Sequence, residues 1–185
     1  MDWKALEAGV RTQVDRGEHD SAATLVIERM GPDLHEFFQR SVDDDEAGDA
    51  LSIWREAVWK DLRNFRWECS LRGWAYRLGR HSLNRILRRP HRHREHTLPS
   101  SAASRLAASI GASGAMTSER HQALAQLRAT LEPEDQELLT LRVDRELEWE
   151  EVSVVLDSTS VAVRKRFERL TRRLEQMARE RGLID

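Results

Sequence analysis

Cysteine is almost absent from this sequence of 185 residues, in which Cys69 stands alone. A single cysteine cannot form an internal disulfide, and it excludes a zinc site of the Cys-x-x-Cys type. No apolar run approaches the ~20 residues that a membrane-spanning helix needs. The N-terminus also lacks the pattern of a signal peptide. We therefore expect a cytoplasmic protein with no membrane insertion.

Glycine and proline are also scarce, with nine and four residues. Runs of β-branched residues, which favour strands, are few. Hydrophobic residues make up 39% of the chain and charged residues 34%. This composition favours an all-α protein with one or two small domains and modest cores.

Motifs that would indicate an enzyme are missing: the sequence contains no P-loop, GxGxxG, HExxH or GxSxG pattern. Cys69 and His81 do not suffice as a nucleophile–base pair, because no third group orients them and no glycine-built oxyanion site accompanies them. The histidine-rich residues 91–96 have no supporting carboxylate or thiol cluster, so we interpret them as part of a basic surface. We expect no enzyme activity, no cofactor and no metal site.

The charges are strongly segregated along the chain. Residues 1–60 hold 7 basic and 14 acidic side chains, whereas residues 61–96 hold 10 and 3. The pattern repeats in residues 119–159, with 4 and 11, and in residues 160–185, with 8 and 4. The intervening residues 97–118 are rich in Ala, Ser and Gly, which is typical of a flexible linker. The sequence thus predicts two domains, each with a surface that faces a polyanion.

Helical periodicity runs through the N-terminal domain. The predicted elements are helices over Met1–Arg16 and Ser21–Met30, a break or restart at Gly31–Pro32, a helix over Asp33–Val42, an acidic loop at Asp43–Glu46 and a helix over Ala47–Leu62. In the last helix Leu51, Trp54 and Val58 form one apolar stripe. Ile53 and Trp59 fall off that stripe, so they either make a second core contact or form an apolar patch for a protein partner.

Aromatic rings and arginines are interleaved between Leu62 and Arg89. Rings and cations together suit unpaired bases and phosphates. Ser70 is the predicted cap of a helix that ends near Arg89, and one face of this helix carries a polar ladder of Arg77, His81, Asn84 and Arg88, with Arg80 beside it. The alternative is a solvated arginine face, although the acids that normally intersperse such a face are missing here.

The C-terminal domain has the pattern of a helix-turn-helix. The predicted elements are helices over Glu119–Leu131 and from Pro133, the segment Glu148–Leu156, a turn at Asp157–Thr159 and a long helix from Ser160. In the long helix a narrow apolar stripe lies opposite several basic side chains. The alternative is a plain helical hairpin with a basic solvent face.

With both domains in place, the chain resembles the sigma-70 family of bacteria, specifically the two-domain extracytoplasmic-function (ECF) sigma factors. The acidic loop followed by ALSIWREAVWKDLRNFRWECSLRGWAYRLGRHSLNRILRR is similar to sigma region 2. The segment LEPEDQELLTLRVDRELEWEEVSVVLDSTSVAVRKRFERLTRRL is similar to sigma region 4. The linker fits as well, since these proteins lack a region 3 domain.

This resemblance implies that residues 1–96 bind the β′ clamp of core RNA polymerase and open the promoter −10 element. The implied single-strand DNA contacts are Trp67, Ser70, Arg72, Trp74, Tyr76, Arg77, Arg80, Asn84 and Arg88. The implied contacts to core polymerase are Asp49, Ser52, Ile53, Arg55, Glu56 and Trp59.

The resemblance further implies that residues 119–185 contact the polymerase β flap and read the −35 element of promoter DNA. The implied contacts of this recognition helix are Thr159, Ser160, Arg164, Lys165, Arg166 and Arg169. Arginine or lysine near the N-terminus of such a helix suits guanine edges in the major groove. An anti-sigma factor is a further expected partner.

Three residues depart from the family pattern. The polymerase-binding helix commonly carries a Gln–Glu/Asp pair, where this chain has Ser52 and Ile53. The turn often has glycine where Asp157 stands, and Asp can adopt the left-handed conformation that the turn requires. Two other functions are alternatives: a helix-turn-helix regulator that binds duplex DNA without polymerase, and a helical adaptor or sigma mimic that does not bind DNA.

Overall fold

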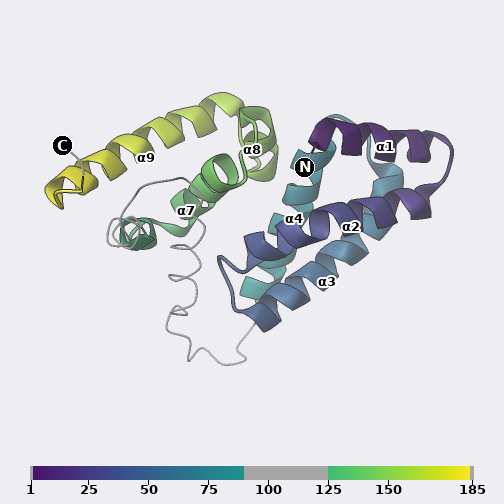
Figure 1. Cartoon of the computed structure of the whole chain (residues 1–185), viewed down its shortest axis with the longest axis horizontal. Helices are drawn as coiled ribbons and strands as arrows, with labels where there is room; N and C mark the ends of the chain where they lie inside the picture. The colour runs from purple at the N-terminus through teal and green to yellow at the C-terminus, as the bar shows by residue number, and fades with distance from the viewer. Residues whose placement is uncertain (1, 90–124, 184–185) are drawn as a thin grey trace. The chain divides into compact units, whose positions relative to one another are not determined.

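The computed structural model of the chain describes residues 2–89 and 125–183. Within these ranges the secondary structure is entirely helical, which confirms the predicted all-α fold class. The chain divides into two compact units, an N-terminal unit with helices α1 to α4 and a C-terminal unit with α7, α8 as far as Ser153, and α9 (Figure 1). Among the described helices, none has the length and apolar character that crossing a bilayer would take.

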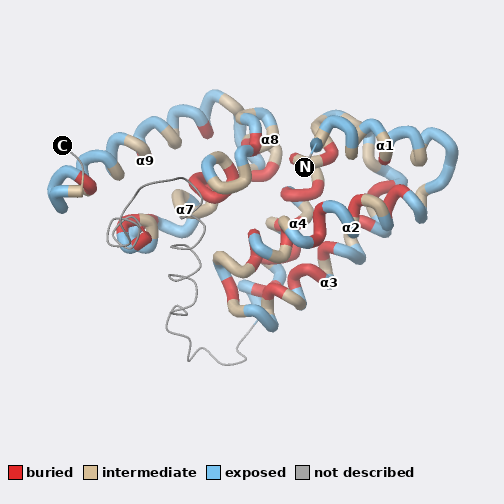
Figure 2. The backbone as a smooth tube through the Cα atoms, viewed as in Figure 1, coloured by how far each residue is buried: buried red, intermediate tan, exposed pale blue. Residues whose placement is uncertain are grey.

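The N-terminal unit is a bundle in which α2, α3 and α4 pack together and α1 covers α2 and one end of α4. Figure 2 shows buried residues along the facing sides of these helices. The elements of the N-terminal unit are α1 (Trp3–Asp15), α2 (His19–Phe38), α3 (Asp44–Asp61), a 3-10 turn (Leu62–Asn64) and α4 (Leu71–Leu87). Trp54, Tyr76, Phe38 and Met30 are the largest fully buried side chains of this core.

Helix α2 is continuous, so the expected break at Gly31–Pro32 is wrong. Pro32 is exposed, whereas Met30 and Leu34 on either side of it are fully buried. A proline inside a helix removes one backbone hydrogen bond. On the solvent side water can satisfy the freed carbonyl, and burial of the flanking apolar residues keeps the helix intact.

The acidic loop before α3 is shorter than the sequence predicted. Asp43 is the N-cap residue, and its carboxylate accepts a hydrogen bond of 2.9 Å from the Glu46 backbone N–H. Asp44, Asp45 and Glu46 form the first helical turn rather than a loop. Three acids in the first turn interact favourably with the helix dipole, which explains the earlier start.

Helix α4 is fixed in the bundle by one hydrogen bond and one close approach. The indole Nε1–H of Trp54 donates to the backbone oxygen of Ala75 over 3.0 Å, within the core. Gly79 faces α2 so closely that a Cβ atom there would lie 2.5 Å from Leu34 Cδ1. Both contacts set the rotation of α4 about its axis. They therefore also set the direction of its basic face, which carries Arg77, His81, Asn84 and Arg88.

The C-terminal unit is built from short helices and one long helix. Residues 125–129 are helical, and α7 (Pro133–Leu139), a π-helix (Thr140–Asp144), α8 (Trp149–Val155) and α9 (Ser160–Glu180) follow. The sequence predicted one helix through PEDQELLTLRVDR, but the backbone widens to π geometry after Leu139. Asp144 at its end makes two hydrogen bonds with Arg128, of 2.8 and 3.1 Å, at a site where both side chains are largely buried.

Replacing Gly79 by alanine is expected to destabilise the protein. The gain in helix propensity, ~1 kcal/mol, is outweighed by the clash with buried Leu34, because overpacking a core costs roughly 1–3 kcal/mol. Gly48→Ala in α3 is the matched control, since a Cβ there meets nothing within 4 Å. Urea unfolding followed by circular dichroism measures both variants. A Gly79→Ala variant as stable as Gly48→Ala would contradict the close packing.

Candidate nucleic-acid interfaces

Three aromatic rings gather at the loop before α4. The Phe65 ring stacks on Trp74 at 4.9 Å between centroids, and it lies 4.7 Å from the Trp67 ring. All three residues are partly exposed. Trp67 has a backbone φ of 58°, a left-handed conformation that a bulky residue rarely adopts. The ring loop, residues 65–70, therefore holds Trp67 in a strained conformation beside two other rings.

Helix α1 supports the ring loop, a role that sequence reasoning missed. The Glu7 carboxylate accepts a hydrogen bond of 2.7 Å from the Leu71 backbone N–H, which satisfies a free donor at the start of α4. Arg11 lies over the Trp67 ring at 5.3 Å. Charged residues of an amphipathic helix look alike in sequence, so nothing marked these two as partners of a loop more than 50 residues away.

Ser70 and Arg72 begin α4. The Ser70 hydroxyl accepts a hydrogen bond of 3.0 Å from the Gly73 backbone N–H, which confirms the predicted cap. The Arg72 guanidinium lies over the ring of Trp3, at 4.4 Å from its centroid. Both side chains thus help to join α4 to its surroundings, and their contact with DNA stays a prediction.

Tyr76 requires a correction. Its side chain is fully buried, and its ring packs edge-on against Phe37 at 5.6 Å. A ring in the core cannot stack on a base, so we no longer assign Tyr76 to the DNA-binding set. The interleaved rings and arginines predict an aromatic surface that includes Tyr76, whereas the rotation of α4 directs this side chain toward α2.

The polar ladder of α4 lies on the side away from the core. Arg77, His81 and Arg88 are exposed, and Arg80 and Asn84 are partly exposed. The spacing of three and four residues places these side chains along one helical face. Their contact with a DNA backbone stays a prediction.

The outward face of α3 carries the residues expected to bind polymerase. Ser52, Arg55, Glu56 and Trp59 are exposed, and Ile53 is partly exposed. Trp59 keeps 42% of its surface accessible, which is high for so large an apolar side chain. The exposed Asp49 pairs with Arg89 over 2.6 Å, so this carboxylate already has a partner within the unit.

Helix α9 begins with the predicted cap and turn. The Thr159 hydroxyl accepts a hydrogen bond of 3.2 Å from the Ala162 backbone N–H. Asp157 has a φ of 49°, which confirms that it adopts the left-handed conformation in the turn. Thr159 is exposed and Ser160 is partly exposed. The arrangement of α8, a short turn and α9 is that of a helix-turn-helix.

Glu150 of α8 organises the first turns of α9. Its Oε1 accepts hydrogen bonds of 3.2 Å from both the Ser160 hydroxyl and the Arg164 guanidinium. The pKa of Glu150 is lowered, chiefly by a hydrogen bond with its own backbone and further by Ser160 and Arg164, against an opposing effect of desolvation. The Arg164 guanidinium also lies 5.8 Å from the centroid of the Trp149 ring. Arg164 is therefore oriented by the protein before any ligand binds.

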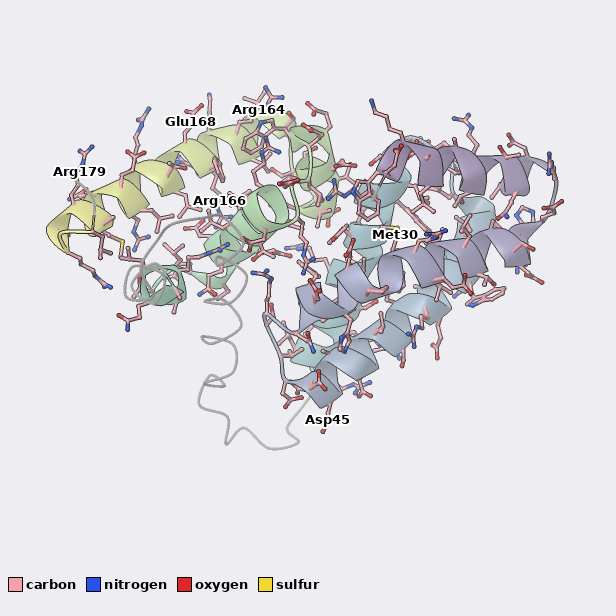
Figure 3. The ribbon with its side chains drawn as sticks, in the orientation of Figure 1. Met30, Asp45, Arg164, Arg166, Glu168 and Arg179 are labelled. Atoms are coloured by element: carbon pink, nitrogen blue, oxygen red, sulfur yellow. The ribbon has the colours of Figure 1, made fainter. Side chains whose placement is uncertain are left out.

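The cations of α9 divide into two groups, as Figure 3 shows for Arg164 and Arg166. Arg166 reaches α7, where its Nε lies 2.7 Å from Asp135 Oδ1. Arg166 therefore links α9 to α7 within this unit, and its expected contact with DNA stays a prediction. Lys165 and Arg169 are exposed and form no ion pair with any described residue. Sequence periodicity places Lys165 and Arg169 opposite the apolar stripe of the helix, with Arg164 and Arg166 flanking them.

No cluster of metal-ligating side chains occurs within residues 2–89 and 125–183. The histidine-rich residues 91–96 and the predicted linker, residues 97–118, lie outside the described residues. Cys69 is partly buried and is not in a disulfide.

Comparison with known proteins adds evidence on the fold. No protein-family model matches the chain, and no curated protein matches its sequence significantly. Among solved structures, the chain is similar to CnrH, whose structure was determined in complex with the cytosolic domain of CnrY. The similarity has a TM-score of 0.65 at 18% sequence identity and covers 95% of this chain and 98% of CnrH. The chain thus shares the fold of CnrH.

Replacing Arg166 by alanine is expected to lower the free energy of unfolding of the full chain by roughly 1 kcal/mol, because the link to Asp135 is lost. A double-mutant cycle with Asp135→Ala measures this coupling in urea. Lys165→Ala, one residue away, is the matched control and should show no coupling with Asp135→Ala. Additive effects of Arg166→Ala and Asp135→Ala would show that the pair is not a structural link.

Proposed function

We propose that the chain is an ECF-type sigma factor that binds core RNA polymerase and directs promoter recognition, −10 melting and transcription initiation. The observation that carries this proposal is the fold similarity to CnrH over nearly the whole of both chains. The ring loop in one unit and the helix-turn-helix in the other support it independently, since each suits a different form of DNA.

The two units have different roles in this proposal. Residues 1–96 bind the β′ clamp through the outward face of α3, and the ring loop with the basic face of α4 holds the opened −10 strand. Residues 119–185 bind the β flap and the −35 duplex. Of the residues that the sequence suggested for α9, Lys165 and Arg169 are available for DNA, and Arg164 is held in place for it.

A protein inhibitor is part of the proposal as well. CnrH is bound to the cytosolic domain of CnrY in its structure. A chain that engages polymerase continually would redirect transcription without control, so we expect an anti-sigma factor to bind this chain in the cytoplasm of a bacterium.

Two other functions would use the same surfaces. A helix-turn-helix regulator would bind duplex DNA alone, without polymerase, through α9. A helical adaptor that mimics a sigma factor would keep Trp59 and its neighbours on α3 but would show no salt-dependent affinity for DNA.

The deciding experiment combines capture of core RNA polymerase with run-off transcription from a fragmented genomic library. The sigma proposal predicts stable association and new transcripts that depend on the chain. Trp59→Ala should weaken the capture by tenfold or more, because an exposed tryptophan at an interface is commonly a hot spot. Leu87→Ala is the matched control, since Leu87 on α4 is 51% exposed but lies outside the proposed polymerase contact.

Tight binding to a duplex without capture of polymerase would favour the independent regulator. Absence of both polymerase capture and duplex binding would favour the adaptor. Equal loss of capture in Trp59→Ala and Leu87→Ala would contradict the assignment of the α3 face.

Replacing Trp67 by alanine should impair strand opening more than duplex binding. Stacking of one base on an aromatic ring contributes ~1–3 kcal/mol, and only the opened strand offers a base to the ring. Opening is measured by the fluorescence of 2-aminopurine in the −10 region, and duplex binding by footprinting of the upstream element. Trp59→Ala, at a concentration that saturates polymerase, is the control. An equal loss in both measurements would mean that Trp67 is only structural.

A further inference from the structure

Val161 is the most exposed large apolar side chain among the described residues, with 63% of its surface accessible. It is the second residue of α9. The packed face of this helix carries Val163 and Leu170, which are both buried, and Val161 lies on the opposite side. Packing within the unit therefore does not account for an apolar residue at this position.

The surroundings of Val161 suit a polyanion. Lys165 follows one helical turn later on the same face, and it has no ion-pair partner among the described residues. The first turn of α9 has no acidic side chain, whereas α7 and α8 each have two. Glu168 is the only acid in residues 160–174. Val161 is thus an apolar spot at the edge of a cationic surface.

A second protein would be the usual partner of an exposed apolar side chain, but the charges here favour nucleic acid. In the major groove of DNA, thymine alone among the four bases presents a methyl group. A side chain that neither donates nor accepts a hydrogen bond can match this methyl and no other base edge. Valine is short and stiff at χ1, so little side-chain entropy is lost when it makes the contact.

We propose that Val161 reads the 5-methyl group of a thymine in the upstream promoter element. This inference rests on the proposed function, because it requires that α9 enters the major groove. Val161 and Lys165 are four residues apart, which corresponds to a rise of about 6 Å along the helix. The thymine should therefore lie within about two base pairs of the base or phosphate that Lys165 contacts.

The test replaces each thymine of the upstream element in turn by deoxyuridine, which removes only the methyl group. Binding of the polymerase complex to each duplex is measured by fluorescence anisotropy. Deoxyuridine at one position should lower the affinity of the protein without substitutions for the duplex by about fourfold, the effect of one buried methyl group. Val161→Ala should bind the thymine duplex about as weakly, and it should not distinguish thymine from deoxyuridine at that position.

Val143→Ala is the matched control, because Val143 is an exposed valine of the same unit, with 52% of its surface accessible, outside α9. It should keep the full sensitivity to deoxyuridine. The inference is overturned if no thymine position shows the effect, or if Val161→Ala retains it. Failure of the sigma proposal is seen separately, as absence of polymerase capture and of chain-dependent transcripts.

Discussion

The close packing of α4 against α2 and α3 is the constraint on which the N-terminal unit depends. Gly79 lets α4 approach Leu34, and the hydrogen bond from Trp54 to Ala75 fixes the rotation of the helix. With that rotation set, Tyr76 must enter the core and Arg77 must face solvent. These two contacts within the core therefore decide which side chains of a mixed aromatic and basic helix can meet a ligand.

The conformation of the ring loop also depends on α4, at the N-terminal end of this helix. A left-handed backbone at a bulky residue costs of order 1–3 kcal/mol, so Trp67 keeps this conformation only because its surroundings enforce it. Phe65 and Arg11 contact its ring, and Glu7 joins α1 to the start of α4. Preorganisation of this kind reduces the entropy that is lost when a base is bound.

Much of this architecture could be predicted from sequence, and the misses have a common cause. Local signals were sufficient for the existence of the helices, for the Ser70 and Thr159 caps and for the left-handed Asp157, because each depends on residues nearby in the chain. They did not predict that α2 continues through Pro32 or that the backbone takes π geometry after Leu139. The burial of Tyr76 and the link from Arg166 to α7 could not be predicted in this way, because the choice between core, neighbouring helix and solvent depends on tertiary packing. Periodicity gives the faces of a helix, but it does not give the element that covers each face.

The dependence on tertiary packing also limits what the net charge of a helix reveals about DNA recognition. The last helix is rich in cations, yet Arg166 contacts α7 and Arg164 is oriented by Glu150. Of the cations that the sequence suggested for base contacts, only Lys165 and Arg169 form no ion pair with a described residue. Contacts to phosphates position a protein on DNA but carry no sequence information. Discrimination between bases must then come from the few side chains that reach base edges. An exposed valine among these cations is informative for this reason, because an apolar group gains nothing from a phosphate and gains from a methyl group.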